Sequence, residues 1–120
     1  MEQHSSTPVQ HLVLFRWPGE PEPQLEVEMR RQISEWIEVI PGLLRLRFGR
    51  DVGGRADGYQ FGLLTEFRDE RALNAYLAHP VHQSFLNWVR ERPFDLIRFD
   101  YPLTPETSLL EPGADDALVR

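Results

Sequence analysis

The residue types best suited to chemistry in this chain gather in the segment 76–82, Tyr-Leu-Ala-His-Pro-Val-His, which holds two of the four histidines. Proline disfavours an α conformation in the residue before it and fits the first turn of a helix. We therefore predict that one helix ends at Ala78 and that a second begins at Pro80. His79 then marks the break, and His82 lies in the first turn of the second helix.

His82 shares a predicted helix face with three apolar residues, because Phe85, Leu86 and Val89 follow it at offsets of three, four and seven. Burial and the positive end of the helix dipole both disfavour a charged imidazolium there. A neutral imidazole facing a dry cavity suits a general base. The same spacing equally describes a buried histidine with one backbone hydrogen bond, so the pattern leaves both interpretations open.

Tyr76 stands at the end of the preceding helix, three residues before His79. Its hydroxyl is a candidate hydrogen-bonding partner for His82 or for a substrate, and a core tyrosine with a solvated hydroxyl fits as well. The two histidines flank a proline break, and no acidic residue lies within a turn of them. We therefore expect no metal at this segment, and no cofactor.

Composition excludes several kinds of chemistry. The chain has no cysteine, and all 13 basic residues are arginine, so neither a thiol nucleophile nor a Schiff-base lysine is available. The net charge of −6 argues against nucleic-acid binding. No apolar run approaches the length of about 18 residues that a membrane span requires, and the first residues are polar. The expectation is a cytoplasmic protein that binds neither nucleic acid nor membrane.

Periodicity gives the elements that must position these side chains. Strands are predicted over 9–17, 44–48, 59–67 and 94–101, and helices over 23–40, 69–78 and 80–91. In the first helix the predicted buried stripe is Leu25, Met29, Ile33, Trp36, Ile37 and Ile40. In the second strand Leu44, Leu46 and Phe48 are predicted to share one face.

The order β-α-β-β-α(α)-β predicts an α+β, ferredoxin-like fold, with helices on one face of an antiparallel four-stranded sheet. The first strand is apolar on both faces, so the second sheet face needs a partner, most simply a second copy of the chain. We expect a disordered N-terminal segment over 1–8, one domain over 9–101 and a tail over 102–120, the tail being either disordered or laid along a partner.

Six short pieces, in this order and spacing, resemble the stress-responsive A/B barrel domain family of the dimeric α+β barrel superfamily. They are His11-Leu12-Val13-Leu14-Phe15, Ile40-Pro41-Gly42, Gly49-Arg50-Asp51-Val52, Gly58-Tyr59, the 76–82 segment and Phe99-Asp100-Tyr101. The resemblance covers about residues 9 to 101. It implies a homodimer whose two sheets pack into a barrel.

The family's best-understood enzyme type is a plant polyketide cyclase that performs an intramolecular aldol condensation without metal or cofactor. The resemblance carries its base over to His82, its partner tyrosine to Tyr76 and a first-strand histidine to His11. A further pocket histidine falls at Phe61, which can make no hydrogen bond. Activity on the same substrate is therefore not expected.

Three functions stay open at this point. The first is a cofactor-independent acid–base enzyme on a carbonyl or polyketide-like substrate, with His82 and Tyr76 catalytic and His11, Phe61, His79 and Phe85 around the substrate. The second is a non-catalytic, stress-associated dimer with a pocket for a small apolar or aromatic ligand. The third is a cofactor-free oxygenase, which no particular residue indicates.

Overall fold

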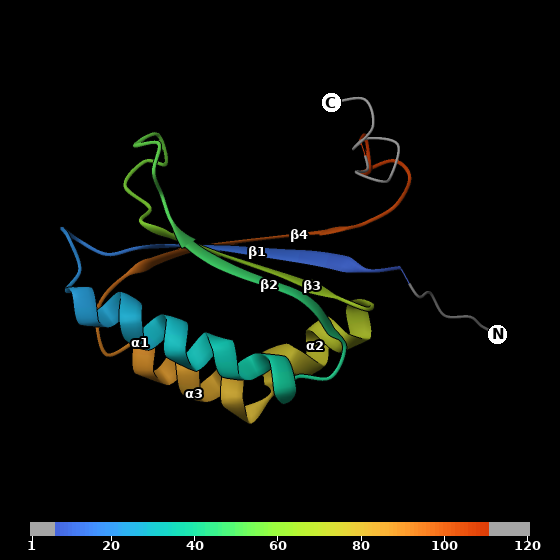
Figure 1. Ribbon diagram of the computed structural model, residues 1–120, viewed down its shortest axis with the longest axis horizontal. Coiled ribbons are helices and arrows are strands. Elements are labelled where there is room, and N and C mark those ends of the chain that lie inside the picture. The colour runs from blue at the N-terminus through green and yellow to red at the C-terminus, as the bar shows by residue number, and fades with distance from the viewer. Residues whose placement is uncertain (1–6, 111–120) are drawn as a thin grey trace, which may run out of the picture.

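A computed structural model describes residues 7–110, and they form a four-stranded antiparallel sheet with all helices on one face (Figure 1). The strands are β1 (Val9–Arg16), β2 (Leu43–Arg50), β3 (Phe61–Phe67) and β4 (Asp95–Pro102). The helices are α1 (Pro23–Ser34), which continues as the 3-10 turn η1 (Glu35–Glu38), then α2 (Glu70–Ala78) and α3 (Pro80–Val89). The predicted ferredoxin-like fold is confirmed.

Strand β1 is central, between β3 and β4, in the sheet order β2-β3-β1-β4. Its side chains alternate as predicted. His11, Val13 and Phe15 are buried under the helices, and Leu12 and Leu14 lie half-buried on the opposite face. Strand β1 therefore carries core residues on one face and an apolar surface on the other.

The long first helix buries the predicted stripe with one exception. Leu25, Met29, Ile33 and Trp36 are buried, but Ile37 is 66% exposed. The prediction for Ile37 was wrong because the α-helix tightens into η1 at Glu35. A 3-10 turn has three residues per turn, which rotates the following side chain away from the α-helical stripe.

Strand β2 also departs from the simple pattern. A bulge between Leu43 and Arg45 shifts the register, so Leu43 packs against the core and Leu44 is 57% exposed. Placing Leu44 with Leu46 and Phe48 was therefore wrong, since an extra residue in one strand reverses the alternation on either side of it.

The break between α2 and α3 is confirmed. The Asp69 side chain caps α2 by accepting a hydrogen bond from the Ala72 backbone N–H at 2.8 Å. The helix ends at Ala78, His79 is extended, and α3 starts at Pro80. His79 then caps α3, with its Nδ1 accepting from the Val81 N–H at 3.1 Å.

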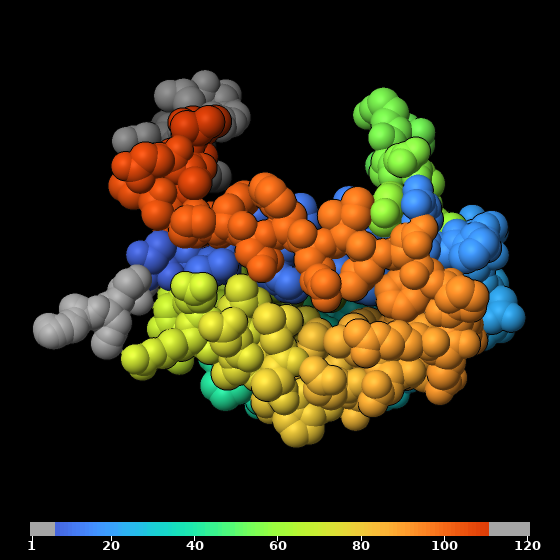
Figure 2. Space-filling view, turned by 180° about the vertical axis from the view of Figure 1, so that it is seen from behind, coloured from blue at the N-terminus to red at the C-terminus, as the bar shows by residue number. Residues whose placement is uncertain are grey.

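The sheet face away from the helices is open and partly apolar. Leu12 lies opposite Leu64 and Phe99, and Leu14 lies opposite Ile97. Phe99 is 59% exposed. The loop 51–60 and the segment 103–110 rise on this side at the two ends of the sheet (Figures 1 and 2). Within residues 7–110, no helix has the length and hydropathy needed to cross a membrane.

Trp36→Ala should lower the free energy of unfolding by about 3–5 kcal/mol, because it removes a fully buried indole from the centre of the core. Urea unfolding followed by circular dichroism measures the change. The neighbouring substitution Ile37→Ala is the matched control and should cost far less. Equal losses in the two variants would contradict this description of the first helix.

Candidate functional site

A small cavity lies between the sheet and helices α2 and α3. Its volume is about 30 Å³, enough for a water molecule or a group of similar size. The residues that line it are His11, Val13, Phe15, Leu63, Tyr76, Leu77, His82, Phe85, Leu86, Leu96 and Arg98. The lining therefore brings most of the candidate residues together in one cavity, among mainly apolar side chains.

His82 is held in one orientation by the end of α2. Its Nδ1 lies 3.2 Å from the carbonyl oxygen of Leu77, a carbonyl near the helix end, where the helix's own backbone leaves acceptors free. Only a protonated Nδ1 can donate to that oxygen. Nε2 is then the unprotonated nitrogen, and it has no hydrogen-bond partner within residues 7–110.

Burial keeps this imidazole neutral. His82 is 7% exposed, and its pKa is lowered chiefly because burial penalises the charged form. The hydrogen bond to Leu77 opposes this shift, while the nearby charges of His11, Arg90 and His79 add to it. The direction agrees with the prediction from sequence, and it leaves Nε2 able to accept a proton at neutral pH.

Tyr76 lies directly beside His82, with ring centroids 4.2 Å apart. The tyrosine is 1% exposed, and its burial raises the pKa of its hydroxyl. That hydroxyl makes no hydrogen bond to any residue in the described part of the chain. The cavity is therefore lined by two residues, His82 and Tyr76, that each carry a polar atom without a hydrogen-bond partner among residues 7–110.

His11 forms a pair that sequence reasoning did not identify. Its Nδ1 contacts Oδ1 of Asp100, which lies directly across from it on β4. The His11 ring is 6.0 Å from the Tyr76 ring. Asp100 stood in the sequence on the same alternating face as Leu96 and Arg98, but only the β1–β4 register reveals the contact. The carboxylate fixes the tautomer of His11, much as Leu77 fixes that of His82.

The remaining candidate residues divide into two groups. Phe85 lines the cavity. Phe61 is buried, but it packs against Trp17 and Phe48 outside the cavity lining, and His79 is used as a helix cap. In the range 7–110 no group of three or more His, Asp or Glu side chains is arranged to hold a metal ion.

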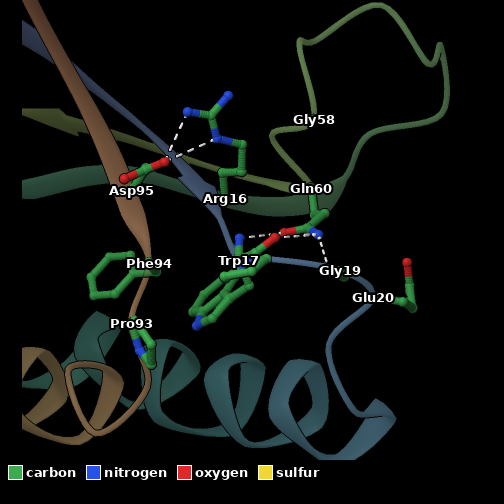
Figure 3. Close-up of a pocket in the computed structure, with 10 residues that line it drawn as sticks. Arg16, Trp17, Gly19, Glu20, Gly58, Gln60, Pro93, Phe94 and Asp95 are labelled. Carbon is green, nitrogen blue, oxygen red and sulfur yellow. Dashed lines mark hydrogen bonds and ion pairs between the residues drawn. The ribbon is translucent and has the colours of Figure 1, made fainter.

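A larger and shallower cleft of about 620 Å³ opens at another part of the surface (Figure 3). Arg16 binds Asp95 there at 2.8 Å, and Gln60 binds the backbone of Trp17 on both its amide atoms. The cleft shares no lining residue with the His82 cavity. Its main polar groups are engaged with one another, so it offers no unengaged base.

The comparisons with known proteins agree with this architecture. The family model for the stress-responsive A/B barrel domain matches residues 9–103. The chain belongs to that family. No curated protein matches it in sequence.

Several solved structures are similar to this chain in fold. A dimeric ferredoxin-like protein of unknown function from Thermobifida fusca is 26% identical, with a TM-score of 0.72 over 84% of this chain and 95% of that one. A family member from Mesorhizobium loti is 26% identical, with a TM-score of 0.65 over 82% and 99%. The hydroxynitrile lyase of Passiflora edulis is 15% identical, with a TM-score of 0.73 over 84% and 97%, and shares the fold.

The lowered pKa of His82 makes part of the stability depend on pH. The unfolded chain, with a histidine pKa of ~6.5, binds the proton more readily than the folded protein. Stability from this group is therefore complete above about pH 6.5 and is lost as the pH falls through the lower, folded-state pKa.

We expect the stability difference between wild type and His82→Gln to shrink as the pH falls below about 6.5. Urea unfolding at fixed protein concentration measures it. His79→Gln serves as the control for general histidine effects. A difference that stays constant with pH would contradict the neutral, buried state of His82.

Proposed function

We propose that this protein is a homodimeric, cofactor-independent enzyme that moves a proton at the carbon next to a carbonyl group. The observation that supports this most concerns Nε2 of His82, which has no partner among residues 7–110, because Leu77 holds the other ring nitrogen in its protonated form. Tyr76, whose hydroxyl is also without a hydrogen-bond partner among residues 7–110, lines the same cavity. A base and a neutral donor beside one small space are the two groups that enolisation needs.

The chemical step follows from these two groups. Nε2 of His82 takes the α proton, the electron pair of the broken C–H bond moves toward the carbonyl, and the carbonyl oxygen becomes an enolate oxygen. The hydroxyl of Tyr76 donates a hydrogen bond to that oxygen and stabilises its charge. Return of the proton, or attack of the enolate on a second carbonyl as in an aldol condensation, completes the reaction. The polyketide cyclases that the sequence resembles use the second route.

The size of the cavity limits the substrate. Pockets that enclose a whole small-molecule ligand usually measure about 300–1,000 Å³. A space of about 30 Å³ admits only the reacting end of a molecule. Phe85 lines that space, and the Trp36 ring packs against both His82 and Phe85.

The same small volume favours the second candidate, a dimer without catalysis, in which His82 is a structural histidine. In that case the Leu77 hydrogen bond serves the α2–α3 junction alone. The two functions differ in whether His82 exchanges protons with a substrate, and this difference can be measured.

Two observations support the homodimer. The open sheet face carries Leu12, Leu14, Leu64, Ile97 and Phe99, an apolar surface that a single helical layer leaves uncovered. Two similar structures, from Thermobifida fusca and Bacteroides fragilis, are described as dimeric with the same fold. A stable interface on this face should bury more than about 1,000 Å².

Proton transfer is tested by hydrogen–deuterium exchange. In deuterated water, the protein should accelerate loss of the α-proton NMR signals of neutral methyl ketones, methyl 4-oxopentanoate among them. His82→Gln should reduce the rate at least about a hundredfold, as expected for loss of a general base. Tyr76→Phe, which keeps the ring, should reduce it less. Exchange that the protein does not accelerate, or that His82→Gln leaves unchanged, rejects the enzyme in favour of the non-catalytic dimer.

The dimer is tested by light scattering. Wild type should have twice the chain mass of 14.0 kDa, and Phe99→Glu should shift the population toward a single chain by placing charge on the apolar face. Val27→Glu, at an exposed position of α1, is the control and should leave the dimer intact. A wild-type protein that runs as one chain at micromolar concentration argues against this assembly.

A further inference from the structure

The cavity of His82 has one permanently charged residue in its lining, Arg98 on β4. Alternation along β4 puts Arg98 on the helix side of the sheet, together with Leu96 and Asp100, and across from Val13. The side chain is exposed at the edge of the sheet. In the space-filling view, the surface is hollowed where β4 passes over α2 and α3 (Figure 2). Arg98 therefore stands at the mouth of the cavity.

Arg98 is a cation without a counter-charge in the described part of the chain. Most arginines that border a pocket here are paired, as Arg16 is with Asp95 and Arg50 is with Glu26. The Arg98 side chain forms neither a hydrogen bond nor an ion pair within residues 7–110. The acid nearest to it on the same face, Asp100, is engaged with His11. A guanidinium stays charged at every relevant pH, so this positive charge is available to a ligand.

Among the described residues no acidic side chain lines the cavity, and apart from Arg98 and the two histidines the lining is apolar or carries only the Tyr76 hydroxyl. An anion at the mouth would therefore meet the N–H donors of the Arg98 guanidinium and no negative charge in the lining. The partly exposed Asp100 carboxylate two residues away disfavours a doubly charged group such as phosphate. A carboxylate carries one charge and matches the guanidinium with two parallel hydrogen bonds.

We propose that Arg98 binds the carboxylate of the substrate, and that the substrate is therefore a small oxo carboxylic acid. This inference rests on the proposed proton-transfer function. The carboxylate stays at the mouth on Arg98, and the ketone end enters the small cavity between His82 and Tyr76. Because only the ketone end enters the cavity, the enclosed space can be far smaller than the whole substrate. Arg98 acts here as a binding residue that sets substrate class.

Binding, measured without reference to turnover, tests the proposal. The probes are 3-oxobutanoate and 4-oxopentanoate, each compared with its neutral methyl ester, titrated into the intact protein and followed by amide NMR shifts. Wild type should bind at least one acid about tenfold or more tightly than its ester, since a charge-assisted bidentate pair is lost in the ester. Arg98→Gln should abolish this preference, and Arg98→Lys should restore part of it.

Arg71→Gln is the matched control. Arg71 is exposed on α2, has no ion pair in the range 7–110 and does not line the cavity, so the variant removes the same charge elsewhere. It should keep the preference for the acid. Equal affinities for acids and esters in wild type, a preference that survives in Arg98→Gln, or an equal loss in Arg71→Gln would each overturn the proposal.

The exchange assay separates this failure from failure of the proposed function. If wild type accelerates α-proton exchange of the neutral ester but binds acid and ester equally, the proton-transfer function is supported and the carboxylate site is rejected. If the preference for the acid depends on Arg98 but the protein accelerates α-proton exchange of no ketone, the carboxylate site is supported as a binding site and the proton-transfer function is rejected.

Discussion

The break between α2 and α3 is the constraint on which the site depends. Pro80 disfavours a helical His79, which is extended, so α2 ends and leaves backbone carbonyls without helical partners. One of them, that of Leu77, accepts from His82 Nδ1 and from the Gln83 side-chain amide, the latter at 2.6 Å. A single covalent restriction thus ends one helix, starts the next and selects the tautomer of the candidate base. Had the chain continued as one helix, the carbonyl of Leu77 would have been used within it.

Much of this arrangement could be read from the sequence because it is local. Proline geometry gives the break, and alternation gives the buried face of β1. The predictions of burial were wrong where a local pattern is interrupted by a change that no residue type indicates. At Ile37 the helix tightens to three residues per turn, and at Leu44 an extra residue reverses the strand's faces. Both are decided by packing against distant elements.

The unforeseen part of the site is non-local. His11 and Asp100 are 89 positions apart, and their contact requires the β1–β4 register. Arg98 has no role that its position in the sequence indicates, and only the cavity lining gives it one. Volume is likewise invisible in a sequence. The residue types around His82 describe a pocket and a packed core equally well, and the difference is a matter of a few tens of Å³ set by rotamers and helix positions.

Strand β4 takes part in both the proposed ligand site and the proposed dimer interface. Odd and even positions of this edge strand serve two different surfaces, since Arg98 and Asp100 point to the cavity side and Ile97 and Phe99 to the open face. A rigid pleated strand cannot move one set without the other. If Arg98 binds the substrate and Phe99 a second chain, as proposed, any shift of β4 links ligand affinity to subunit association, and by reciprocity each changes the other by the same factor. The apparent affinity for a small molecule would in that case depend on protein concentration, a behaviour that belongs to the pair of chains and to neither chain alone.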